Sequence, residues 1–198
     1  MVMSVTDKGG DMANRDGDVR DRLQQAALGL FQEHGYDRTT AAEIAARAGV
    51  TERTFFRHFP DKREVLFDGE AILREALLAA IGDIPDDVGP LDTLFRAFGS
   101  IQPLLENNRS FAKPRQALIA GTPALQEREL AKLAVLADAL AEALVARDVP
   151  EVRAILAART GMAAFAQAVM SWLDDEEGGL GARLDLTERE LNAIVTHC

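Results

Sequence analysis

Three side chains with hydrogen-bond donors share one face of a short segment of this 198-residue chain. On a helical wheel at about 100° per residue, Arg53, Thr54 and Arg57 fall on the same side. Phe55 and Phe59 fall on the opposite side. Guanidinium and hydroxyl groups donate hydrogen bonds to phosphate oxygens and to the acceptor edge of guanine. The spacing therefore predicts a helix that is anchored by its aromatic side and contacts DNA with its polar side.

A second short helix is predicted directly before this one. Thr40 followed by Glu43 forms a capping box, which marks the start of a helix. Gly49 can take the positive φ of a tight turn, and Thr51 can cap the helix that follows it. Two short capped helices joined at a glycine are typical of the helix-turn-helix motif.

The segments on either side of this motif complete the expected DNA-binding part. A helix is predicted from about Asp18 to Gly35, with an apolar stripe that supports the motif from behind. A further helix is predicted to start at Asp61, where its N–H groups and the ammonium of Lys62 could hold a phosphate. Residues 1–17 are expected to form a flexible tail, with additional DNA contacts by this tail left open as an alternative.

The charge distribution agrees with one DNA-facing region on an acidic protein. The net charge is −10, but residues 38–63 contain six basic and three acidic side chains, a local charge of +3. The rest of the chain then carries −13. A local excess of this size is weak evidence for DNA binding, because charged runs are usually only solvated surface.

Many positions of this region resemble the DNA-binding signature of the tetracycline-repressor (TetR) family of bacterial regulators. The matching residues are Thr39-Thr40, Ile44-Ala45, Ala48-Gly49-Val50, Thr54-Phe55-Phe56-Arg57-His58-Phe59 and Lys62, within about residues 20–67. The resemblance implies contacts to the DNA backbone by Thr40, Thr51, Thr54, Phe56, His58 and Lys62. It also implies that Arg53, together with Glu52 or Arg57, approaches the bases. Phe56 stands where the family commonly has tyrosine, so the phenolic hydrogen bond to a phosphate is lost.

The remaining sequence predicts an all-α protein of about nine helices. Its apolar residues are mainly Ala and Leu, which favour helices, and runs of β-branched residues are absent. Beyond the motif, helices are expected at about 61–81, 91–107, 111–121, 123–147, 150–173 and from 187 onward. The expected organisation is a tail at 1–17, a DNA-binding domain at 18–65, and an effector-binding and dimerisation domain at 66–198.

The predicted helix at 150–173 carries apolar residues on most of its sides. Such a helix must be covered on most sides, either by its own chain or by a second one. The family resemblance implies a homodimer built on the last two long helices. Full burial within a single chain is the alternative.

The resemblance also implies a cavity for a small effector in the C-terminal domain. Candidate lining residues are Phe95, Phe98, Gln102, Phe111, Arg115, Met162, Phe165, Gln167 and Trp172. Plain core is the alternative role for each. If the cavity exists, its apolar wall favours a lipophilic ligand, with an acidic group opposite Arg115.

Other classes of protein are disfavoured by the sequence. The three histidines are scattered, and no pattern of catalytic or metal-ligating residues is present, so we expect no enzyme, cofactor or metal site. No apolar run reaches the roughly 18 residues of a membrane span, and a signal peptide is not evident, so a cytoplasmic location is expected. The favoured function is a repressor released from a palindromic operator by a small lipophilic effector. The alternative is a helical interaction or DNA-architectural protein without an effector.

Overall fold

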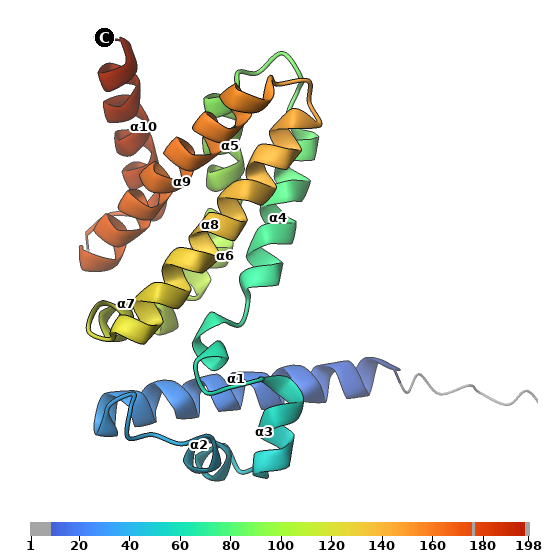
Figure 1. The fold of residues 1–198 in the computed structure, drawn as a ribbon, viewed down its shortest axis with the longest axis vertical. Coiled ribbons are helices and arrows are strands. Elements are labelled where there is room, and N and C mark those ends of the chain that lie inside the picture. The colour runs from blue at the N-terminus through green and yellow to red at the C-terminus, as the bar shows by residue number, and fades with distance from the viewer. Residues whose placement is uncertain (1–8, 176, 197–198) are drawn as a thin grey trace, which may run out of the picture. The chain divides into compact units, whose positions relative to one another are not determined.

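The computed structural model describes residues 9–175 and 177–196. Within these residues the chain forms ten α-helices and one 3-10 helix, with no strand (Figure 1). The elements are α1 Gly9–His34, α2 Ala41–Arg47, α3 Glu52–His58, η1 Glu64–Phe67, α4 Glu70–Asp83, α5 Pro90–Ser100, α6 Gln102–Asn107, α7 Arg109–Ala120, α8 Pro123–Val145, α9 Glu151–Asp174 and α10 Leu180–Thr196. The predicted all-α class is confirmed.

The helices gather into two compact units that divide between Asp68 and Gly69. The N-terminal unit contains α1, α2, α3 and η1, and the C-terminal unit contains α4 to α10. The sequence predicted a boundary between residues 65 and 66.

The first helix starts earlier than predicted. α1 begins at Gly9 instead of Asp18, so residues 9–17 are helical and the predicted tail is corrected there. Residues 1–8 of that tail lie outside the described residues. Extending an existing helix adds one hydrogen bond per residue without a new nucleus, and this gain outweighs the weak helix propensity of the Asp, Asn and Gly residues.

The predicted helix at 61–81 is interrupted. η1 occupies Glu64–Phe67, Gly69 follows with a φ of +90°, and α4 begins only at Glu70. Glycine takes this left-handed conformation without the steric cost that a β-carbon brings. The predicted helix at 91–107 is likewise divided into α5 and α6, because Pro103 in the first turn of α6 lacks the N–H that continuing α5 would require.

The core of the C-terminal unit is built around α9, which packs against α5, α8 and α10 (Figure 1). Leu94, Phe98 and Leu140 from the neighbouring helices are fully buried with Ala158 of α9. A β-carbon at Gly161 would lie 2.9 Å from Cδ1 of Leu94, so any larger residue there would require the buried Leu94 side chain to shift. This dense packing leaves little free volume where α5, α8 and α9 meet.

α9 is long and apolar enough to cross a membrane by length and composition alone, although the sequence predicted no such segment. The same composition is expected of a core helix in a soluble protein. Ten of its residues are buried, including Met162, Phe165 and Trp172, and they contact the other helices of this unit. Packing within the unit therefore accounts for the buried side of α9, whereas Val152 and Leu156 on another side are exposed.

Candidate nucleic-acid interface

The start of α2 is held by a complete capping box, as predicted. The hydroxyl oxygen of Thr40 accepts a hydrogen bond from the backbone N–H of Glu43 at 3.2 Å. In return, Oε2 of Glu43 accepts from both the N–H and the hydroxyl of Thr40, each at 2.8 Å. These hydrogen bonds lower the pKa of Glu43, so its carboxylate stays ionised and keeps the cap.

The turn and the start of α3 also follow the prediction. Gly49 has a φ of +71°, and the guanidinium of Arg22 on α1 donates to the carbonyl of Ala48 at 2.8 Å. Thr51 caps α3 by accepting from the N–H of Thr54 at 3.1 Å. The orientation of α3 is therefore set by hydrogen bonds at its first turn as well as by packing.

The two sides of α3 differ as the helical wheel predicted. Phe55 and Phe59 are 0% and 3% exposed, and their rings lie 5.9 Å apart between centroids. Glu52, Arg53 and Arg57 are exposed on the surface of the unit. The aromatic pair anchors a short helix whose opposite side exposes charged side chains.

The hydroxyl groups near this surface are partly engaged within the protein. The O–H of Thr40 points to Glu43, so it is not free to donate to a phosphate while the capping box is intact. The hydroxyls of Thr51 and Thr54 lie 2.9 Å apart and share one hydrogen bond. Since each hydroxyl carries one proton, this pair retains one proton for an outside acceptor. Phe56 is 51% exposed and offers an apolar surface but no donor.

α1 contacts the end of α3 through Asp16. Nη2 of Arg57 lies 3.4 Å from Oδ1 of Asp16, and both side chains are 63% exposed. Nε2 of His58 lies 3.8 Å from the same oxygen, but the His58 side chain is only 5% exposed. The resemblance implied a backbone contact by His58, whereas the structure buries most of the ring against the N-terminal unit.

The stability of the N-terminal unit is expected to depend on His58 below about pH 6.5, the pKa of an unperturbed histidine. Burial, followed by the charge of Arg57, lowers the pKa of His58 in the folded chain. The unfolded chain therefore binds the proton first as the pH falls. The contribution of neutral His58 to stability is therefore complete above about pH 6.5. It is lost as the pH falls from there toward the lower pKa of His58 in the folded chain.

Urea unfolding at several pH values measures this effect. His58→Gln keeps a polar side chain and removes the titration, so its stability is expected to change less with pH than that of the wild type. Equal pH dependence of the two proteins would contradict the account.

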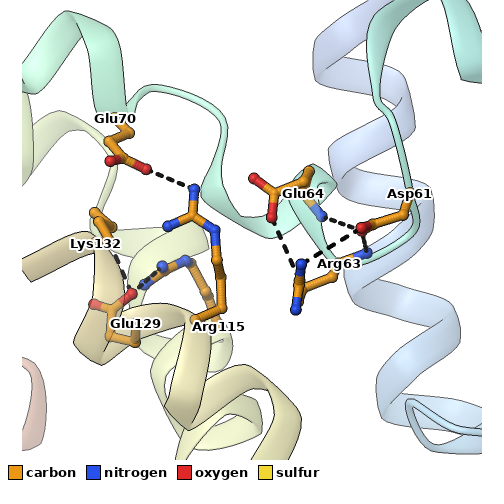
Figure 2. A network of polar contacts seen from close by, with 8 residues as sticks. Asp61, Arg63, Glu64, Glu70, Arg115, Glu129 and Lys132 are labelled. Carbon is orange, nitrogen blue, oxygen red and sulfur yellow. Dashed lines mark hydrogen bonds and ion pairs between the residues drawn. The ribbon is translucent and has the colours of Figure 1, made fainter. Parts of the chain in front are cut away.

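The predicted phosphate site at the start of the next helix has a different arrangement. Oδ1 of Asp61 accepts from the N–H groups of Arg63 and Glu64, at 2.7 and 3.0 Å (Figure 2). The ammonium of Lys62 donates to backbone carbonyls of the loop between α1 and α2. The N–H groups and the ammonium that were expected to hold a phosphate thus have partners within the N-terminal unit.

The candidate effector residues occupy separate places in the C-terminal unit. Phe95, Phe98, Met162 and Phe165 meet in the core, where the rings of Phe98 and Phe165 stack with centroids 4.5 Å apart. Trp172 belongs to the same core near the C-terminal end of α9, and the guanidinium of Arg109 lies over its ring, 5.2 Å from the centroid.

The other four candidates lie outside this cluster. Phe111 on α7 is buried, and Gln102 donates to Glu106 beside the start of α10. Gln167 is exposed on α9, and Arg115 takes part in a polar network. The structure therefore brings together four of the nine candidates, with Trp172 further along the same core.

That polar network contains mostly buried charges, of which only Arg115 was predicted from the sequence as a functional residue. Nη2 of Arg115 lies 2.7 Å from Oε2 of Glu129, and Nζ of Lys132 lies 3.7 Å from the same oxygen (Figure 2). Arg128 pairs with Glu70 at 2.9 Å. Side-chain exposure is only 13% for both Arg115 and Lys132. The burial of Glu129 and Lys132 could have been predicted from the sequence, because these positions lie on the same face of α8 as the buried leucines at 125 and 136.

The pKa shifts in this network follow from burial and from neighbouring charges. Burial raises the pKa of Glu129, but the charges of Arg115, Lys132 and Arg128 outweigh burial and hold it below the usual value. Burial, followed by the charge of Arg115, lowers the pKa of Lys132. Glu129 is therefore the ionised carboxylate that offsets two cations in a poorly solvated place.

The capping box of α2, the glycine turn and the exposed arginines of α3 together define a helix-turn-helix protein. Residues 23–68 match the family model of bacterial regulatory proteins of the tetR family. Residues 88–196, more than half of the chain, match the model of the MftR C-terminal domain. The chain belongs to the TetR family of bacterial regulatory proteins.

A named relative supports the same assignment for one part of the chain. The transcriptional regulator TcmR of Streptomyces glaucescens is 41% identical over 83 residues, which are 42% of this chain and 37% of TcmR. The chain spans between 34% and 47% of the length of the curated relatives that it matches.

Solved structures resemble the fold over most of the chain. Thermus thermophilus FadR, a TetR-family repressor solved in complex with lauroyl-CoA, covers 86% of this chain and 91% of its own, with 24% identity and a TM-score of 0.53. The complex of SmeT with triclosan covers 85% of this chain and 89% of its own, with 24% identity and a TM-score of 0.59. At this identity the likeness supports the fold alone.

Proposed function

We propose that the protein is a transcriptional regulator that inserts α3 into the major groove of operator DNA. The observation that carries this proposal is the fixed orientation of α3, with Phe55 and Phe59 buried and Arg53 exposed on the opposite side. A recognition helix needs this combination, because its base contacts depend on a rigid support behind it.

The exposed side chains suggest separate roles in recognition. Arg53 is assigned to a guanine edge, since a guanidinium can bond O6 and N7 together, with Glu52 or Arg57 as further base contacts. The free proton of the Thr51 and Thr54 pair is assigned to a phosphate. Phe56 is assigned to apolar contact with the sugar-phosphate wall. Thr40 and His58 would contact the backbone only after rearrangement of the bonds described above.

Replacing Arg53 with alanine is expected to weaken operator binding by about 1–3 kcal/mol and to relax the preference at one base pair. Binding of the two proteins to an operator and to its single-base variants measures both effects. Arg74→Ala, at an exposed arginine on α4, serves as the control and is expected to leave both unchanged. A uniform loss across all base variants would show that Arg53 contacts phosphate.

We propose further that the protein is a homodimer through α9 and α10. Val152 and Leu156 on α9 are 72% and 62% exposed, and Ala163 and Gln167 continue the same stripe along the helix. On α10, Ile194 is 65% exposed. Exposed apolar side chains at helical spacing favour burial against a second copy. Gln167 then belongs to the dimer interface, and a monomeric mass at micromolar concentration would contradict this assignment.

A small lipophilic effector is proposed to release the protein from a palindromic operator, which makes the protein a repressor. The similar structures of FadR with lauroyl-CoA and SmeT with triclosan motivate this chemistry. The apolar core around Phe98 is the region that such a ligand would have to open. An acidic group would compete with Glu129 for Arg115. Release requires that the ligand prefer the state that cannot bind DNA.

Titration of the DNA complex with lauroyl-CoA and with triclosan tests the effector proposal. Release at micromolar concentration by one of them would support it. Unchanged DNA binding with both ligands at saturation would favour the alternative, a helical interaction or DNA-architectural protein without an effector. Because a transcriptional regulator acts on the chromosome, we propose a cytoplasmic location. We also propose that the protein has no enzymatic activity.

A further inference from the structure

Lys62 lies in a cage of backbone carbonyls instead of facing solvent. Its ammonium nitrogen is 2.7 Å from the carbonyl oxygen of Tyr36, 2.8 Å from that of Thr39 and 3.3 Å from that of Asp37. It also lies 4.4 Å from the centroid of the Tyr36 ring. An ammonium group carries three protons, so three carbonyls can use all of its donors.

The cage belongs to the loop that leads into α2. Within this loop the hydroxyl of the buried Thr39 shares its one proton between the carbonyls of Gly35 and Leu30, at 2.9 and 3.3 Å. The next residue, Thr40, caps α2. Lys62 therefore ties the segment after α3 to the loop before α2, at the point where the two helices of the motif must keep their relative position.

We propose that Lys62 positions the start of α2 for DNA binding and does not itself contact a phosphate. To reach a phosphate, the ammonium would have to leave three charge-assisted hydrogen bonds and its contact with the ring. Carbonyls left behind in a partly buried loop would lose their bonds without full hydration. The inference rests on the proposed function, since the motif must bind DNA for its geometry to matter.

A phosphate contact and a positioning role predict different salt dependence. Loss of one phosphate contact lowers the slope of log K against log salt by about 0.9. A positioning residue lowers affinity without changing the number of phosphate contacts, so the slope stays the same. The two roles also predict different results for the substitution Lys62→Arg. The guanidinium of arginine binds phosphate well, but its planar shape cannot fill a cage shaped for an ammonium group.

The experiment compares Lys62→Met and Lys62→Arg with the wild type in operator binding at several salt concentrations. All proteins are measured well below their melting temperatures. Both variants are expected to bind about tenfold more weakly, with slopes that change by less than about 0.3. Arg38→Met removes one positive charge from the same loop, leaves the cage intact, and is expected to change affinity by less than about twofold.

Two outcomes would overturn the inference. Normal binding by Lys62→Arg together with a slope loss of about one unit in Lys62→Met would identify a phosphate contact. A lower melting temperature with unchanged affinity of the folded variants would identify a purely structural residue. Failure of the wild type to bind DNA at all would reject the proposed function instead, so the two failures are distinguishable.

Discussion

Phe98→Ala is expected to lower the free energy of unfolding of the C-terminal unit by about 3–5 kcal/mol. Phe98 is fully buried on α5, stacks on Phe165 of α9 and contacts the edge of Phe95. Removing the ring costs its transfer free energy and leaves a cavity between two closely packed helices. The cost depends on how far the helices can relax into that cavity.

Chemical denaturation of the wild type and the variant measures the effect. Ile72→Ala on α4 is the control, because Ile72 is 60% exposed and its loss is expected to cost less than about 1 kcal/mol. A similarly small cost for Phe98→Ala would mean that Phe98 lines an open site and not the core. If a lipophilic effector enters this region, it should bind the variant more tightly, because the cavity is already open.

Glu129→Ala is expected to destabilise the same unit by about 3 kcal/mol, because it removes the carboxylate that offsets Arg115 and Lys132. The remaining cations repel one another in a place where both are only 13% exposed. The pKa of Lys132, already lowered by burial and Arg115, should fall further when this carboxylate is gone.

Thermal and urea unfolding measure the loss. Glu127→Ala is the matched control, since Glu127 is an exposed carboxylate on the same helix and is expected to contribute less than about 0.5 kcal/mol. A loss for Glu129→Ala as small as the control's would mean that groups other than Glu129 stabilise the two cations.

The helix-turn-helix was predictable because its determinants are local. The capping box at Thr40, the glycine at position 49 and the cap at Thr51 each act within four residues, so spacing alone identified them. The burial of Phe55 and Phe59 followed from helical periodicity.

The other features depend on residues that are distant in sequence. Lys62 donates to carbonyls 23 to 26 positions away, which no local pattern reveals. The pair of Arg115 and Glu129 joins α7 to α8. Gln167 was assigned to a cavity by residue type, but the side on which α9 packs leaves it exposed. The break at Gly69 depends on a backbone conformation that a glycine permits but does not require.

Selection of bound DNA from a random library with the purified protein tests most directly whether α3 reads sequence. We expect enrichment of two inverted half-sites whose centres lie about 10 base pairs, or a multiple of that, apart. The Arg53→Ala protein is expected to lose the preference at one position of each half-site. No enrichment, with equal affinity for selected and random DNA at every salt concentration, would show that α3 does not read sequence.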